Sequence, residues 1–196
     1  MAAREPRGPY AKGELKREEI LDQAVAAFGQ YGYHATSMRE IAVACGLSQP
    51  GLLHYYPNKE ALLLALVNRR EADQAPAKSE GPEDWFNQLI KRAAKNQKEK
   101  TVTQLWASLA AEATDPGYPL HEMFKDRYRN LREVWAKEFA ENAGRSRPTD
   151  EDRMKAALLA SIWDGLQQQW LLDSKFDMKR PFEYALSMLS RYSQFK

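Results

Sequence analysis

The sequence predicts an all-α protein of about nine helices. Apolar residues recur at helical spacing along most of the chain, as Leu21, Val25 and Phe28 do near its start. No stretch alternates polar and β-branched apolar residues, so we expect no sheet. Clusters of Pro, Gly and Asp separate the apolar segments. The expected helices are 14–31, 38–44, 48–55, 58–74, 83–98, 102–113, 119–142, 150–173 and 179–194.

Length and composition are those of an ordinary globular protein. The 196 residues can bury a substantial core, and 43% of them are hydrophobic and 29% charged. The longest apolar run, residues 61–67, is far shorter than the ~20 residues of a membrane helix, and the N-terminus lacks the apolar stretch of a secretory signal. The single cysteine, Cys45, suits a reducing compartment. We therefore expect a cytoplasmic protein with no membrane partner.

The most specific local pattern begins at Ser37. Ser37 with Glu40 three residues later is a capping box, which opens the short helix 38–44. Gly46 stands in the connection that follows, where the backbone must turn into the left-handed region. The first helix, 14–31, ends in the same way at Gly32.

The helix 48–55 follows this connection directly. Ser48 is a typical N-cap, and Pro50 lies in the first turn, where its missing N–H has no cost. Two short helices joined by a three-residue glycine turn form a helix-turn-helix, a common DNA-binding layout. An αα corner without a DNA role is the alternative.

From Ile20 to Leu64 the chain resembles the TetR (tetracycline-repressor) family of bacterial transcriptional regulators. The matching positions are Ala24, Phe28, Gly32, Tyr33, Thr36, Ser37, Arg39, Ile41, Ala42, Gly46, Ser48, Leu52, Tyr56, Asn58, Lys59, Glu60, Ala61 and Leu62. The resemblance implies three N-terminal helices that bind DNA and a helical body that binds a ligand and dimerises. We therefore expect a flexible basic arm at 1–13, a helix-turn-helix domain at 14–57 and a ligand-binding and dimerisation domain at 58–196.

Base contacts are expected from the start of the second helix of this motif, because the N-terminal residues of a recognition helix reach the base edges. Gln49 can pair with adenine, Pro50 can pack on a thymine methyl group, and Gly51 permits close approach. The resemblance gives Arg39 the position of a guanine-reading arginine; a salt bridge or a phosphate contact is the alternative. The family usually has tyrosine where this chain has Leu53, which removes one expected hydroxyl contact.

Phosphate contacts are expected from hydroxyls, helix N-termini and a cation around the same helices. The residues concerned are Thr36, Ser37, Ser48, His54, Tyr55 and Lys59. Exposure without a contact is the alternative for His54. The basic arm could also lie along the phosphates or in the minor groove, with a solubilising tail as its alternative.

The last two helices carry more apolar surface than a single core requires, and helix 150–173 is apolar on more than one side. This predicts a symmetric dimer through a four-helix bundle, as the resemblance also implies. The expected interface residues are Leu158, Ile162, Gly165, Phe182, Leu186 and Leu189. Completion of a monomer core by both helices is the alternative.

A ligand pocket is expected among the aromatic residues of the body. They suit an apolar or aromatic small-molecule effector, which the sequence does not identify. The expected lining residues are Trp85, Phe86, Leu89, Trp106, Leu109, Phe124, Tyr128, Ile162 and Leu166. Aromatic side chains at helical spacing also form ordinary cores, which is the alternative for each of them.

Enzyme chemistry is not expected. The sequence has no glycine-rich phosphate loop and no Cys/His metal spacing, and its three histidines are scattered, so we predict no catalytic residues, no metal and no cofactor.

The excess of positive charge lies in the N-terminal third of the chain. Residues 1–70 hold nine Lys+Arg and seven Asp+Glu, which accounts for the whole net charge of +2.

These features predict a transcriptional regulator that binds a palindromic operator as a homodimer and is released by a small molecule. A repressor is the main hypothesis and an activator remains open. A helical interaction module that no longer binds specific DNA is the alternative from another class.

Overall fold

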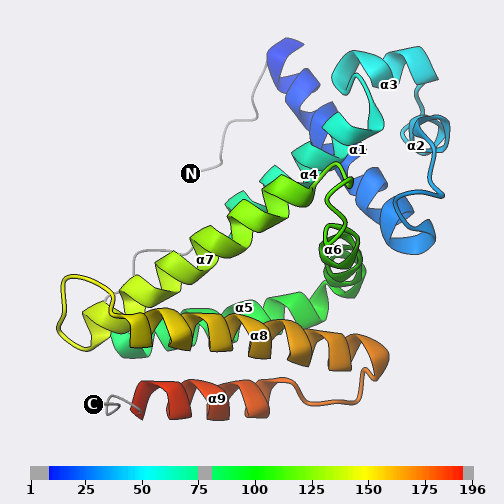
Figure 1. Cartoon of the computed structure of the whole chain (residues 1–196). Coiled ribbons are helices and arrows are strands. Elements are labelled where there is room, and N and C mark those ends of the chain that lie inside the picture. The colour runs from blue at the N-terminus through cyan, green and yellow to red at the C-terminus, as the bar shows by residue number, and fades with distance from the viewer. Residues whose placement is uncertain (1–8, 75–80, 192–196) are drawn as a thin grey trace, which may run out of the picture. The chain divides into compact units, whose positions relative to one another are not determined.

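The computed structural model describes residues 9–74 and 81–191, which contain nine α-helices and no strand (Figure 1). The all-α prediction is confirmed. The helices are α1 Pro9–Tyr31, α2 Met38–Ala44, α3 Gln49–Tyr55, α4 Lys59–Gln74, α5 Pro82–Lys98, α6 Lys100–Glu112, α7 His121–Asn142, α8 Asp150–Leu172 and α9 Lys179–Arg191. None of these helices is long and apolar enough to cross a membrane.

The first helix differs from the prediction at its start. It begins at Pro9 instead of residue 14, so residues 9–13 are helical and do not form a flexible arm. Proline suits a first helical turn, since the N–H that it lacks would have no partner there. The rest of the expected arm, residues 1–8, lies outside the described residues.

The chain divides into two compact units, 1–73 and 74–196. In the first unit, α1 to α4 enclose a core whose fully buried side chains include Ile20, Phe28 and Leu62. Arg69 of α4 pairs with Glu18 and Asp22 of α1, at 3.1 and 2.8 Å. These pairs attach α4 to α1, so the compact unit extends beyond residue 57. The predicted end of the DNA-binding domain at residue 57 concerns function and remains a prediction.

The second unit is built around α8, which packs against α7 and α9 (Figure 1). One core joins buried residues of α5, α7, α8 and α9, among them Trp85, Trp135, Leu159 and Phe182. Burial of this many large apolar side chains provides the main stabilisation of the unit.

Candidate functional site

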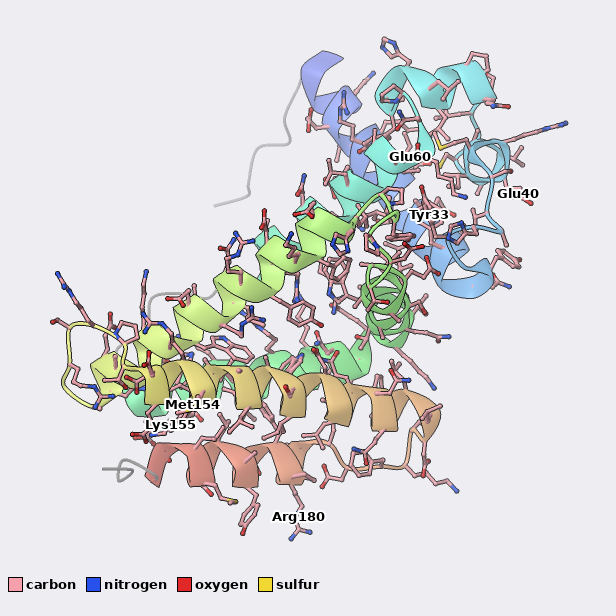
Figure 2. The ribbon with its side chains drawn as sticks, viewed as in Figure 1. Tyr33, Glu40, Glu60, Met154, Lys155 and Arg180 are labelled. Carbon is pink, nitrogen blue, oxygen red and sulfur yellow. The ribbon has the colours of Figure 1, made fainter. Side chains whose placement is uncertain are left out.

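The start of α2 is fixed by the predicted capping box. The Ser37 hydroxyl oxygen accepts a hydrogen bond from the backbone N–H of Glu40 at 3.2 Å, and the Glu40 carboxylate accepts one from the Ser37 N–H at 2.7 Å. The hydrogen bonds from Ser37 lower the pKa of Glu40 below its ordinary value. Glu40, labelled in Figure 2, is the only acid between residues 23 and 58, and these bonds occupy its carboxylate.

The turn between α2 and α3 depends on one glycine. Gly46 has φ +64°, which is the left-handed region that a side chain disfavours. The N–H of Leu47 donates to the Ala42 carbonyl at 2.8 Å, and the N–H of Gly46 donates to the Val43 carbonyl at 3.0 Å. This pattern is a Schellman motif, which ends α2 and starts the chain toward α3.

The second helix of the motif, α3, packs through its apolar side and presents its first turn to solvent. Leu52 is fully buried, and the Ser48 hydroxyl oxygen accepts from the Gly51 N–H at 3.2 Å, as expected of an N-cap. Gln49 and Pro50 are exposed in the first turn of α3. Arg39 is exposed near the start of α2, so the side chains predicted to read bases are on the accessible part of this motif.

Most of the predicted phosphate contacts lie on accessible positions. Ser37, Ser48 and His54 are exposed and Tyr55 is half-buried. Lys59 is half-buried, and its ammonium lies 4.3 Å from the Tyr33 ring centre and donates to the His34 carbonyl at 3.3 Å.

Thr36 departs from its predicted role. Its side chain is buried and its hydroxyl donates to the carbonyl of Gly32 at 2.9 Å, with a second carbonyl, that of Ala27, at 3.3 Å. The hydroxyl therefore closes the turn after α1 and is not presented to a phosphate. The sequence did not reveal this because a threonine near a helix start has the same pattern in either role.

Two cations of α1 were not predicted to support the helix-turn-helix. The Lys16 ammonium donates to the carbonyl of Cys45 at 2.7 Å, at the C-terminal end of α2, where the helix dipole favours a positive charge. Arg17 donates to the Tyr55 carbonyl at 3.2 Å and lies 5.7 Å from the Tyr56 ring centre. The sequence showed both residues only as part of a basic N-terminal stretch.

The predicted dimer residues divide into two groups. Phe182 and Leu186 are buried in the core of their own unit, so they are not available to a partner, while Leu189 and Ile162 pack against that core from its edge. Leu158 is exposed, and an added Cβ at Gly165 would meet no atom within 4 Å. Apolar residues occur at helical spacing on two sides of α9, so the sequence did not show which side packs against the core of its own unit.

The predicted pocket residues also divide. Trp85, Leu89 and Leu166 belong to the core, and Phe86 and Ile162 pack against it. Phe86 also lines a small recess together with Phe139 and Leu189. The pocket role of these five residues remains a prediction.

The other predicted pocket residues lie on α6 and α7. The rings of Trp106 and Phe124 are 5.2 Å apart, while Leu109 is buried. The Tyr128 hydroxyl donates to Asp164 at 2.7 Å, and the surrounding protein raises the pKa of Asp164 above its ordinary value. These groups combine aromatic surface with a carboxylate at an exposed position of α8.

Residues 9–74 and 81–191 contain a helix-turn-helix in the first unit and further helices in the second, which is the architecture of a helix-turn-helix regulator. The family described as "Bacterial regulatory proteins, tetR family" matches residues 20–66. This part of the chain is thus similar to the DNA-binding segment of that family.

Curated relatives match part of the chain. The HTH-type transcriptional regulator RutR of Escherichia coli K12 is 41% identical over 54 residues, which are 28% of this chain and 26% of that protein. The HTH-type transcriptional repressor AcnR of Corynebacterium efficiens is 36% identical over 64 residues, 33% of this chain and 34% of that protein. The chain thus matches between a quarter and a third of the length of these relatives.

Solved structures resemble the whole fold at low sequence identity. A complex of SmeT with triclosan has a TM-score of 0.74 at 20% identity and covers 89% of this chain and 90% of SmeT. A complex of AibR with isovaleryl coenzyme A and operator DNA has a TM-score of 0.63 at 21% identity and covers 88% of this chain and 97% of AibR. The second unit therefore has the fold of these regulators although its sequence has diverged.

Proposed function

We propose that this protein is a sequence-specific DNA-binding transcriptional regulator of the cytoplasm, acting as a repressor that a small molecule releases from its operator. The observation that carries the proposal is the exposed first turn of α3, with Gln49 and Pro50 accessible on a helix whose opposite side is fixed by the buried Leu52. A rigidly held recognition helix with free N-terminal side chains is what base readout in a major groove requires. The operator DNA bound to AibR is consistent with this use of the fold.

Within this proposal, Gln49, Pro50 and Gly51 contact bases from α3, and Arg39 contacts a guanine or a nearby phosphate from α2. The phosphate backbone is held by Ser37, Ser48, His54, Tyr55 and Lys59. Thr36 acts only by shaping the turn before α2.

DNA selected from a random pool provides the first test, followed by affinity measurements on the selected duplex. Gln49→Ala should weaken binding by about 1–3 kcal/mol and relax selectivity at one base pair. Gln30→Ala, which changes an exposed glutamine of α1, is the matched control and should have no effect. Failure to enrich any sequence would contradict the proposal and favour a helical interaction module.

We also propose that the protein acts as a two-fold homodimer. Support comes from a second apolar face of α8, where Met154 is 60%, Leu158 54% and Leu172 80% exposed. These residues and Gly165 follow at i, i+4, i+11 and i+18, so they share one side of the helix, and Tyr184 and Met188 add exposed apolar surface on α9. Several exposed apolar side chains on one side of a helix are typical of an interaction site, and a two-fold dimer would read a palindromic operator.

Sedimentation velocity at micromolar concentration tests the dimer. Leu158→Glu should convert it to a monomer, whereas Val134→Glu, at a partly exposed position of α7, should leave it intact. Because a Cβ at Gly165 meets nothing in its own chain, Gly165→Leu should weaken association without destabilising the monomer. A wild-type protein that sediments as a monomer would overturn this part of the proposal.

The effector site is proposed beside α6 and α7, around Trp106, Leu109, Phe124 and Tyr128. Arg127 lies 5.3 Å from the Trp106 ring centre and 5.5 Å from that of Tyr128, so the aromatic surface there is accompanied by charge. A ligand that binds the non-operator arrangement more tightly lowers operator affinity by that difference in binding free energy. A thermal-shift screen of apolar and aromatic compounds, repeated with Trp106→Ala, tests the position.

A further inference from the structure

The two helices of the helix-turn-helix are too short to fix their own orientation. α2 and α3 have seven residues each, and isolated helices shorter than about 12–15 residues are marginal in water. Packing holds α2 through the buried Ile41 and Ala42, whereas α3 has a single buried residue, Leu52, among the residues that the structure describes. Such a short helix can tilt about its one buried side chain unless its ends are attached as well.

Both ends of α3 are attached, by different means. At its N-terminal end, the Ser48 hydroxyl oxygen accepts a hydrogen bond from the Gly51 N–H at 3.2 Å. At its C-terminal end, the Arg17 guanidinium donates to the Tyr55 carbonyl at 3.2 Å. Arg17 also lies 5.8 Å from the Tyr55 ring centre and 5.7 Å from that of Tyr56, which is within the range of a cation–π contact. One side chain of α1 therefore holds the last residue of α3.

The neighbouring residue of α1 holds the same end of α2. The Lys16 ammonium donates to the carbonyl of Cys45, the C-cap of α2, at 2.7 Å. Carbonyls at a helix C-terminus lack partners within the helix and favour a nearby cation. Because Lys16 and Arg17 are consecutive, their side chains leave α1 about 100° apart and reach two different helices. The C-terminal ends of α2 and α3 are thus both attached to one turn of α1.

Local acids compensate the charges of both side chains. The Lys16 ammonium lies 2.8 Å from the Glu19 carboxylate, and the Arg17 Nε lies 3.8 Å from that of Glu14. The side chains of Lys16 and Arg17 are 24% and 43% exposed. A phosphate contact raises affinity by releasing counterions from the DNA, which requires a cation that can turn toward the phosphate. Cations that are already bonded to a carbonyl and paired with an acid are better suited to fixing the geometry of the motif.

We propose that Lys16 and Arg17 are positioning residues for operator recognition, which hold α2 and α3 at the angle that brings Arg39 and Gln49 to the same half-site. The inference rests on the proposed DNA-binding function. Arg39 and Gln49 are exposed near the starts of α2 and α3, at the opposite ends from those that α1 holds. Each helix is roughly 10 Å long, so a tilt of about 10° moves its far end by roughly 2 Å. Hydrogen bonds to base edges do not survive such a displacement.

Affinity measurements on the selected operator duplex and on a random-sequence duplex test the proposal. Lys16→Met and Arg17→Met each remove the cation and keep an unbranched side chain. Each should weaken operator binding about five- to tenfold and change random-duplex binding by less than about twofold. The dependence of operator affinity on salt should stay at its wild-type slope. Lys59→Met, at a predicted phosphate contact, is the comparison and should reduce that slope by about 0.9.

Conservative variants separate positioning from loss of the fold. Lys16→Arg keeps a cationic donor for the Cys45 carbonyl and should bind the operator within about twofold of wild type. Arg17→Lys keeps the charge but loses the planar group beside two rings, so it should weaken operator binding about threefold and leave random-duplex binding unchanged. Circular dichroism shows whether each variant remains folded. If Arg17→Met does not, Arg17→Lys decides.

Amide hydrogen exchange of the free protein provides a measurement that does not depend on DNA. Arg17→Met should speed exchange across residues 52–56 at least about fivefold and leave the second unit unchanged. Lys12→Met, which changes an exposed lysine of α1, is the matched control and should not alter this exchange.

The outcomes distinguish this inference from the proposed function. A wild-type protein that selects no operator contradicts both. Selection of an operator by wild type, with affinity or exchange unchanged in Arg17→Met, contradicts the inference alone. Equal losses on the operator and random duplexes, together with a salt slope reduced by about 0.9, would instead make Lys16 and Arg17 phosphate contacts and overturn their positioning role.

Discussion

Asp152 is the residue whose loss should most weaken the start of α8. Its side chain is only 1% exposed and accepts hydrogen bonds from the Thr149 N–H and hydroxyl, both at 2.8 Å, and from Arg145. It thus serves as the third helical residue of a capping box and as an ion-pair partner at once. Asp152→Ala removes both roles, while Asp150→Ala changes an aspartate of the same turn that is 98% exposed.

The magnitude follows from these contacts. Loss of the capping interaction costs about 1 kcal/mol. Loss of the hydrogen bonds from the guanidinium costs about 1.5–3 kcal/mol when both partners are buried. Arg145 is 39% exposed and regains hydration, so the lower half of that range applies. We therefore expect Asp152→Ala to reduce the free energy of unfolding by about 2–3 kcal/mol, and Asp150→Ala by about 0.5 kcal/mol through the helix dipole.

Guanidinium unfolding followed by tryptophan fluorescence measures this difference at a fixed protein concentration. All five tryptophans lie between residues 85 and 170, so the fluorescence reports the second unit alone. An equal effect of the two substitutions, or a loss below about 1 kcal/mol for Asp152→Ala, would refute the reasoning.

The pH dependence of the same difference has a definite sign. Burial alone would raise the pKa of Asp152, but the hydrogen bonds from Thr149 and Arg145 outweigh it and hold the pKa below its ordinary value. A carboxylate with a lowered pKa contributes stability that is fully present above its unfolded pKa of about 3.9 and is lost as the pH falls through the lowered value. The difference between wild type and Asp152→Ala should be constant from about pH 5 to 8 and shrink below about pH 4.

Three further predictions concern the first unit. Leu52→Ala should destabilise it by roughly 2–5 kcal/mol because Leu52 is fully buried, whereas Leu53→Ala, at a 37% exposed position, should cost below about 0.5 kcal/mol; loss of helix by circular dichroism on heating checks both. Thr36→Val should lower the free energy of unfolding by about 1 kcal/mol and leave the operator affinity of the folded protein unchanged, measured by fluorescence anisotropy on a selected duplex. Gly46→Ala should lower the free energy of unfolding by about 1–2 kcal/mol, because alanine disfavours the positive φ of this position and its Cβ would make no compensating contact. Unfolding followed by circular dichroism measures this loss.

The helix-turn-helix could be predicted from the sequence because its determinants are local. Ser37 and Glu40 are three residues apart, and Gly46 and Ser48 act on the backbone within one turn of themselves. Such interactions have the same form wherever the segment lies in a fold. The predicted capping box and the predicted glycine turn are accordingly both present, while the roles of the DNA-contacting residues remain predictions.

The body was less predictable because its residues meet across long sequence separations. Trp85 and Phe139 are 54 positions apart and form one edge-to-face pair, so nothing local distinguishes a core tryptophan from a pocket tryptophan. The small recess lined by Asn142 and Leu189 has the same origin, since these two residues come from different helices. Side chains with identical helical spacing can therefore serve in a pocket or in the core, and the structure places Trp85, Leu89 and Leu166 in the core.

The two faces of α8 and α9 explain why some of the predicted dimer residues are buried in the core and others are exposed. On α8, Leu159 is fully buried while its neighbour Leu158 is 54% exposed, and on α9 the buried Leu186 lies nearly opposite the exposed Tyr184. Hydrophobicity is the same on either side, so the sequence reveals the excess of apolar surface but not which side the chain itself covers. The structure resolves that ambiguity in favour of Leu159 and Leu186 as core residues. The surface left for a partner then consists of Leu158 and the residues in line with it, which is why an acidic substitution there should break association while leaving the core intact.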